Sequence, residues 1–123
     1  MRVQRAYDGL VDCYKAWSPF IFRVPPMVPI HVSLTVRNQS DIEDVARLLA
    51  THSRLSRSEP GCLRFELYQS NLDPHAFFIL EEWESQAALE VHREADAFQT
   101  IYAPQVLPLV ERAAHPVTVV EGR

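Results

Sequence analysis

The hydrophobic pattern of this 123-residue chain alternates between two periods, and this constrains the fold more than any other feature of the sequence. Apolar residues occupy every second position from Ile30 to Val36, which is typical of a half-buried strand. Residues 42–57 instead carry an apolar stripe at spacings of three and four, which predicts a helix. Ser40 and Glu43 form the pattern of a capping box at the start of this helix.

The switch of period repeats in the second half of the chain. Leu63, Phe65 and Leu67 alternate with polar residues and predict a second strand with these three side chains on one face. Turn-forming residues 71–74 follow, and the alternating run 77–84 then predicts a third strand.

A second helical region and a last strand complete the pattern. Ser85 is suited to cap the helix, and Asp96 is suited to restart it. Pro104 and Pro108 bound a short helical piece, and residues 117–120 predict the last strand. The inward stripe of the helical region comprises Ala88, Leu89, His92, Phe98, Ile101 and Tyr102.

The resulting order, βαββαβ, predicts an α+β fold of the ferredoxin-like type. Because short βαβ crossovers are right-handed, we expect a four-stranded antiparallel sheet with both helices on one face. The other face carries apolar side chains that need a cover, so a second copy of the chain is expected to form a homodimer there.

The first 27 residues lie outside this pattern. Apolar residues in the segment 3–14 follow a helical stripe, and the proline-rich segment 20–29 predicts an extended connector. We therefore divide the chain into an N-terminal helix and arm, residues 1–27, and one domain, residues 28–123.

Composition excludes several classes of protein. The net charge is −4, from 12 basic and 16 acidic residues without a basic stripe, so we expect no nucleic-acid partner. No apolar run approaches the roughly 20 residues of a membrane span. The three glycines stand singly, which argues against conventional NAD, FAD and ATP sites. Two cysteines are too few for a disulfide framework or a cysteine zinc site, so we expect a cytoplasmic location. The five histidines have no short ligand spacing, so we expect no metal.

His92 is the first candidate for a catalytic group. The ordinary pKa of histidine, about 6.5, suits proton transfer at neutral pH, and His92 lies on the helix face that points to the sheet. The alternative is a core histidine bonded to a backbone carbonyl. Trp83 and Tyr102 are candidates for a substrate pocket, with core packing as the alternative for each. We place Phe65 and Phe98 in the same pocket.

Several short runs, in this order, resemble the antibiotic biosynthesis monooxygenase family, and most closely its quinol monooxygenase branch. The resemblance covers roughly residues 28–121. The runs are Glu59-Pro60-Gly61-Cys62 with Phe65 and Glu66, then Glu81 to Ser85, then Ala88, Leu89 and His92, and then Phe98.

The resemblance implies a dimeric α/β barrel that uses dioxygen without flavin, haem or metal. The expected substrate is a small electron-rich aromatic or quinol, which a base deprotonates in a dry pocket. The expected function is therefore a cofactor-independent monooxygenase with His92 as the base. The alternative is a non-catalytic small-molecule-binding or structural dimer of the same fold. An open cavity that reaches His92 favours the enzyme, whereas a filled core with His92 bonded to the backbone favours the alternative.

Overall fold

The computed structural model describes residues 27–122, and these form four strands and the helices between them. The helix and arm expected in residues 1–26 lie outside the described residues. The elements are β1 (Val28–Val36), a 3₁₀ turn (Gln39–Asp41), α2 (Ile42–Arg57), β2 (Cys62–Gln69), β3 (Ala76–Trp83), α3 (Gln86–Glu94), the π-helical segment η2 (Ala97–Val106), a second 3₁₀ turn (Leu107–Leu109) and β4 (Val110–Pro116).

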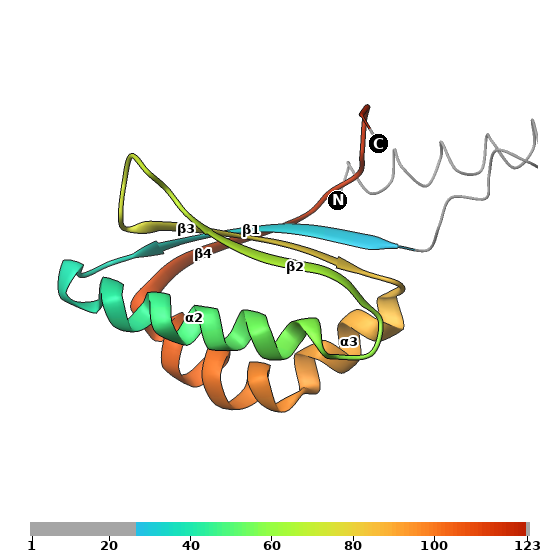
Figure 1. The fold of residues 1–123 in the computed structure, drawn as a ribbon, viewed down its shortest axis with the longest axis horizontal. Helices are drawn as coiled ribbons and strands as arrows, with labels where there is room; N and C mark the ends of the chain where they lie inside the picture. The colour runs from blue at the N-terminus through green and yellow to red at the C-terminus, as the bar shows by residue number, and fades with distance from the viewer. Residues whose placement is uncertain (1–26, 123) are drawn as a thin grey trace, which may run out of the picture.

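The four strands form one sheet in the order β2-β3-β1-β4, and all neighbours are antiparallel. Figure 1 shows α2, α3 and the helical segment that follows it on the same side of this sheet. This arrangement confirms the predicted ferredoxin-like βαββαβ fold. The opposite face of the sheet carries no helix of the described part of the chain.

The core lies between the sheet and the helices. The alternation predicted for β1 is confirmed, because Ile30, Val32, Leu34 and Val36 are all buried. The inward residues of β3 and α2 pack against them and complete the core; they include Phe77, Ile79, Trp83, Val45 and Leu49.

The three predicted helix starts have different outcomes. Asp96 directly precedes η2, as predicted for a restart, but its side chain makes no capping hydrogen bond. The Ser85 hydroxyl accepts a hydrogen bond from the Ala88 N–H at 3.1 Å and caps α3 as predicted. The capping box of Ser40 and Glu43 is not formed, because no side chain caps α2 or the turn before it. The chain enters α2 through the 3₁₀ turn, so Ser40 already lies inside a helical turn and not at its start.

The predicted inward position of Leu63 is wrong. A register shift between Cys62 and Arg64 adds one residue to β2, so Cys62 packs against the core and Leu63 is 56% exposed. A bulge inserts one extra residue into one strand of a pair, so the side chains on one side of the bulge change the face of the sheet to which they point. The hydrophobic pattern of a single strand does not show where such an insertion occurs.

The last strand was predicted at residues 117–120, and this is also wrong. β4 spans Val110–Pro116 and pairs with β1 from Val36 opposite Val110 to Ile30 opposite Pro116. It is an edge strand whose residues after Val110 are all exposed, so no apolar alternation marks it.

Pro104 does not bound a helical piece, because it lies inside the π-helical segment η2. A proline lacks the N–H that a helical turn uses. The Gln105 side-chain amide donates to the Thr100 carbonyl at 2.9 Å, so one backbone carbonyl of this turn accepts its hydrogen bond from a side chain.

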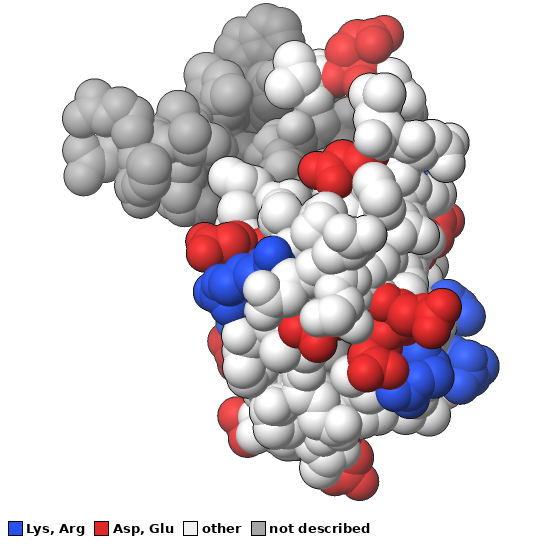
Figure 2. All heavy atoms as spheres, turned by 90° about the vertical axis from the view of Figure 1, so that its left-hand side faces the viewer, with Lys and Arg blue, Asp and Glu red and all other residues white. Residues whose placement is uncertain are grey.

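Charges are mixed on the surface that Figure 2 presents, where basic side chains lie next to acidic ones. Among residues 27–122, no helix is both long and apolar enough to cross a membrane.

Candidate functional site

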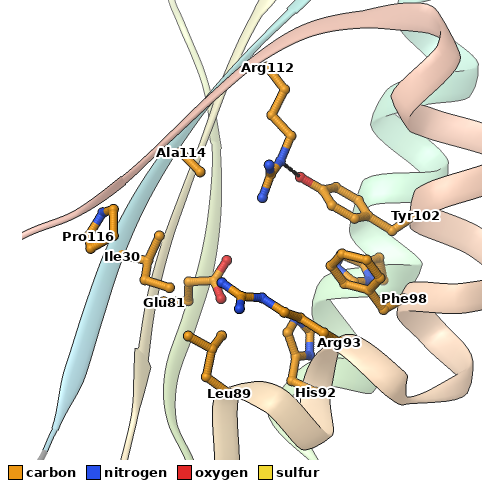
Figure 3. A pocket seen from close by; sticks show the side chains of 11 residues that line it. Ile30, Glu81, Leu89, His92, Arg93, Phe98, Tyr102, Arg112, Ala114 and Pro116 are labelled. Carbon is orange, nitrogen blue, oxygen red and sulfur yellow. Dashed lines mark hydrogen bonds between the residues drawn. The ribbon is translucent and has the colours of Figure 1, made fainter. Parts of the chain in front are cut away.

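A cavity of about 410 Å³ opens between the sheet and the helices (Figure 3). Its volume lies in the range of roughly 300–1,000 Å³ that is typical of small-molecule sites. Strands β1, β3 and β4 and helices α2, α3 and η2 all contribute to its wall. The polar and titratable residues of the wall are His52, Glu81, His92, Arg93, Tyr102 and Arg112.

Three of the five predicted site residues line this cavity. They are His92, Phe98 and Tyr102, whose side chains surround the same space in Figure 3. Trp83 and Phe65 are fully buried and do not belong to the cavity wall. Trp83 stacks on the His92 ring with centroids 4.4 Å apart, and Phe65 contacts Trp83 edge-on at 6.4 Å. These two side chains therefore form the packed support behind the histidine.

The partner of His92 is a carboxyl group and not a backbone carbonyl. Its Nδ1 lies 2.6 Å from Oε1 of Glu59, which belongs to the loop between α2 and β2. Both side chains are largely buried, and that of Glu59 is 14% exposed. The other ring nitrogen of His92, Nε2, makes no hydrogen bond with the described residues.

Gly61 brings this loop close to α3. Its φ of +80° lies in the left-handed region that favours glycine. A Cβ at this position would lie 2.5 Å from the Cβ of Ala88 on α3. The loop can therefore approach α3 only without a side chain here, and this approach places Glu59 beside His92.

Burial opposes charge on both members of the pair. It raises the pKa of Glu59 to about 7. Burial, together with the positive charge of Arg93, lowers the pKa of His92 to about 4. At neutral pH the imidazole is thus neutral, and a proton added to the pair resides on Glu59. The pair takes up this proton near pH 7.

His52 is a site residue that the sequence analysis did not select. Its ring stacks on Tyr102 with centroids 4.5 Å apart and lies 5.7 Å from the ring of His92. Burial, and then the nearby His92, lower its pKa to about 4, and its buried Nδ1 has no hydrogen-bond partner among the described residues. The helical spacing from Leu48 and Leu49 places His52 on the inward face of α2, so this signal was present in the sequence.

Arg112 was also missed, because the strand that carries it was predicted elsewhere. Its Nε donates to the Tyr102 hydroxyl oxygen at 2.8 Å (Figure 3). Burial raises the pKa of Tyr102, against the opposing effect of the Arg112 charge. The phenol is therefore protonated at neutral pH, and its O–H remains available to a molecule in the cavity.

Glu81 contributes a carboxyl group to the cavity, on the inward face that the alternation of β3 predicted. Its Oε1 accepts a hydrogen bond from Trp83 Nε1 at 2.7 Å. Burial raises the pKa of Glu81, although this hydrogen bond and two nearby arginines oppose the shift. Within the described part of the chain, no group of three or more His, Cys, Asp or Glu side chains is arranged to hold a metal ion.

Comparisons with known proteins agree with this architecture. A family model described as antibiotic biosynthesis monooxygenase matches residues 27–104. An uncharacterized protein of Synechocystis is 35% identical over 75 residues, and the match covers 60% of this chain but only 48% of that relative. The chain therefore spans about half the length of this curated relative.

Two solved structures share the fold at low sequence identity. One is a Bacteroides thetaiotaomicron protein of unknown function described as a possible oxidoreductase, with 22% identity and a TM-score of 0.69 over 75% of this chain and 96% of the other. The second is SnoaB of Streptomyces nogalater, a cofactor-independent oxygenase, with 14% identity and a TM-score of 0.69 over 79% and 96% of the two chains.

Proposed function

Because this chain belongs to the antibiotic biosynthesis monooxygenase family, we propose that it is a cofactor-independent monooxygenase that oxidises a small aromatic or quinol-like substrate with dioxygen. The observation that carries the proposal is the His92–Glu59 pair at the wall of an open cavity. A filled core with His92 bonded to the backbone would have favoured a structural role. The description of SnoaB as a cofactor-independent oxygenase supports the reaction type.

The first step is deprotonation of a phenolic hydroxyl. Above pH 7, Nδ1–H of His92 donates to the ionised Glu59, and the lone pair of Nε2 accepts the phenolic proton. The Nδ1 proton then passes to Glu59, so the imidazole ends neutral and no buried imidazolium has to persist. This relay reconciles a basic role for His92 with its lowered pKa of about 4.

Tyr102 stabilises the phenolate that this step creates. Its O–H, at the Arg112 end of the cavity, donates to the second ring oxygen of a quinol whose first hydroxyl lies at His92, while its own oxygen accepts from Arg112 Nε. The positive charge of Arg112 therefore polarises the tyrosine towards donation. The half-buried ring of Phe98 and the buried ring of His52 exclude water around the anion.

Dioxygen supplies the oxidising power. The phenolate transfers one electron to dioxygen, and the resulting semiquinone and superoxide couple to form a carbon–oxygen bond. Loss of water then leaves the oxidised ring. For a hydroquinone the balance is one hydroquinone and one dioxygen giving one hydroxyquinone and one water. The protein contributes the base, the hydrogen-bond donor and the enclosed cavity.

A homodimer is the proposed assembly. The helix-free face of the sheet carries the half-exposed side chains of Tyr68 and Phe78 on the neighbouring strands β2 and β3. Packing this face against a second copy would remove these aromatic groups from water.

Oxygen uptake with a panel of hydroquinones tests the proposed activity. The full chain should consume one dioxygen for each hydroquinone and release the hydroxyquinone. His92→Ala and His92→Gln should abolish uptake in a protein that remains folded by circular dichroism, whereas His75→Ala, the same change outside the cavity, should retain it. Binding of hydroquinones without oxygen uptake would instead identify a non-catalytic binding protein. Full activity of the folded His92 variants would remove His92 from the mechanism.

A further inference from the structure

Two guanidinium groups face the cavity. Arg93 extends from α3 towards Glu81, and Arg112 enters from β4 at the other end of the space (Figure 3). The two residues thus come from elements that are distant in the sequence but meet at one cavity.

Among the described residues, these guanidinium groups lack carboxylate partners and keep both terminal nitrogens free of hydrogen bonds, whereas Arg54 and Arg57, which also form no ion pair, donate through a terminal nitrogen to other groups. Arg37, Arg47 and Arg64 each form an ion pair with a carboxylate. Neither Arg93 nor Arg112 forms an ion pair within residues 27–122. The Arg93 side chain makes no hydrogen bond there, and that of Arg112 uses only its Nε, on Tyr102. The terminal nitrogens of both residues therefore remain available as donors.

The cavity is less acidic than the protein as a whole. Its wall holds two arginines and one glutamate, so the formal charge of the wall is +1 when Glu81 is ionised and both histidines are neutral, and Glu59 behind His92 brings the sum to zero when it is ionised. The whole chain carries −4. Glu81 forms no ion pair with either arginine among the described residues, although both arginines lie near enough to oppose the rise in its pKa.

We infer that the cavity is selective for aromatic substrates that carry a carboxylate, which the free donors of Arg93 bind while a neighbouring ring hydroxyl lies at His92. A guanidinium presents paired N–H donors in a planar fork that matches the two oxygens of a carboxylate. The aromatic side chains of Phe98, Tyr102 and His52 supply the surface for the ring. This inference rests on the proposed function and specifies its substrate class as a hydroxylated aromatic acid.

Matched ligands test the selectivity without turnover. Calorimetric titration of the full chain, without oxygen, compares 2,5-dihydroxybenzoate with the neutral 2,5-dihydroxybenzamide. The two share the hydroquinone ring and differ in charge. Since charge-assisted hydrogen bonds are strong but Arg93 is open to solvent, we expect the benzoate to bind about 10-fold more tightly. Added salt should weaken the benzoate selectively.

Variants then assign the preference to the cavity. Arg93→Gln should weaken the benzoate several-fold and leave the benzamide unchanged. Arg47→Gln is the matched control, because Arg47 lies on the exposed side of α2 and pairs with Asp44; both affinities should stay at the wild-type values. Circular dichroism and melting temperature verify that each variant is folded.

Equal affinity for the two ligands, no binding of either, or an equal loss of both in Arg93→Gln would overturn the inference. The proposed activity fails separately. If the benzoate is preferred but no oxygen is consumed with any hydroquinone, the anion selectivity stands and the monooxygenase assignment is wrong. If neutral quinols are oxidised and the benzoate has no advantage, the activity stands and the selectivity is wrong.

Discussion

Replacing Glu59 by glutamine separates a proton-accepting role from a structural one. The glutamine side chain keeps an oxygen that accepts from His92 Nδ1–H, but it cannot take the proton. We therefore expect Glu59→Gln to lower activity and, above pH 7, to raise stability. If Glu59 served only to hold His92 in place, glutamine would keep that role and the activity would stay near the wild-type value.

The size of the kinetic effect follows from the two shifted groups. The wild-type pair takes up a proton near pH 7, whereas the pKa of the His92 imidazole itself is about 4. The variant therefore loses about three pKa units of basicity. The fall in kcat/KM is about 30-fold if half of this loss is felt in the transition state, and about 1,000-fold if all of it is felt there. The rise in activity of the wild type through pH 7 should disappear in the variant.

The stability effect has the opposite sign. The folded state raises the pKa of Glu59 from 4.5 to about 7 and so favours its protonated form. The stability that Glu59 contributes is therefore full below pH 4.5 and is lost as the pH rises through 7. Glutamine resembles the protonated form at every pH. Because Glu59 is only partly buried, solvent screening reduces the effect of its shifted pKa, and at pH 8 the variant should be more stable by about 1–2 kcal/mol, with little difference at pH 4.

Oxygen uptake between pH 5.5 and 9 and denaturant unfolding at pH 4 and pH 8 measure the two effects. Glu90→Gln is the matched control, because Glu90 is exposed on α3, the helix that carries His92. An unchanged kcat/KM and pH profile in Glu59→Gln would refute the relay. A loss of stability at pH 8 would show that Glu59 acts as an ionised structural partner.

Four further outcomes are expected. The pKa of buried His52 falls from 6.5 to about 4 on folding, so the stability that neutral His52 contributes is full above pH 6.5 and is lost in acid. When the pH falls from 7 to 4, the free energy of unfolding of the wild type should therefore decrease by about 2–3 kcal/mol more than that of His52→Phe. Tyr102→Phe should lower kcat/KM by about 10- to 100-fold through loss of the donor, with the melting temperature nearly unchanged. Gly61→Ala should destabilise the fold by about 2–4 kcal/mol, since positive φ and close packing both oppose a side chain; a stability equal to wild type would contradict the backbone geometry. Light scattering at micromolar concentration should report about 28 kDa, twice the 14.1 kDa chain, and a monomer would refute the proposed dimer.

The sequence alone determined the elements whose burial is one-sided and regular. Period-two alternation identified β1 and β3, and the stripe of α2 identified that helix, because each buries one face along its whole length. Ser85 marked the start of α3, since a cap is a local interaction. The same local signals placed His92 and Tyr102 on the inward side.

The tertiary structure decided the features that depend on a neighbour. β4 is defined by its pairing with β1 and not by its own hydrophobicity, so residues 117–120 looked more strand-like than the true strand. The bulge that exposes Leu63 is likewise a property of the β2–β3 pair.

The chemistry of the site was the part least accessible to sequence. Glu59 and His92 are 33 positions apart, and the hydrogen bond between them exists only because Gly61 lets the loop approach α3. Arg112 reaches Tyr102 only through the position of β4. The shifted pKa values arise from burial that no single segment produces. Helical and strand periodicity determined which face each candidate residue occupies, whereas the contacts between faces determined which protons it can hold.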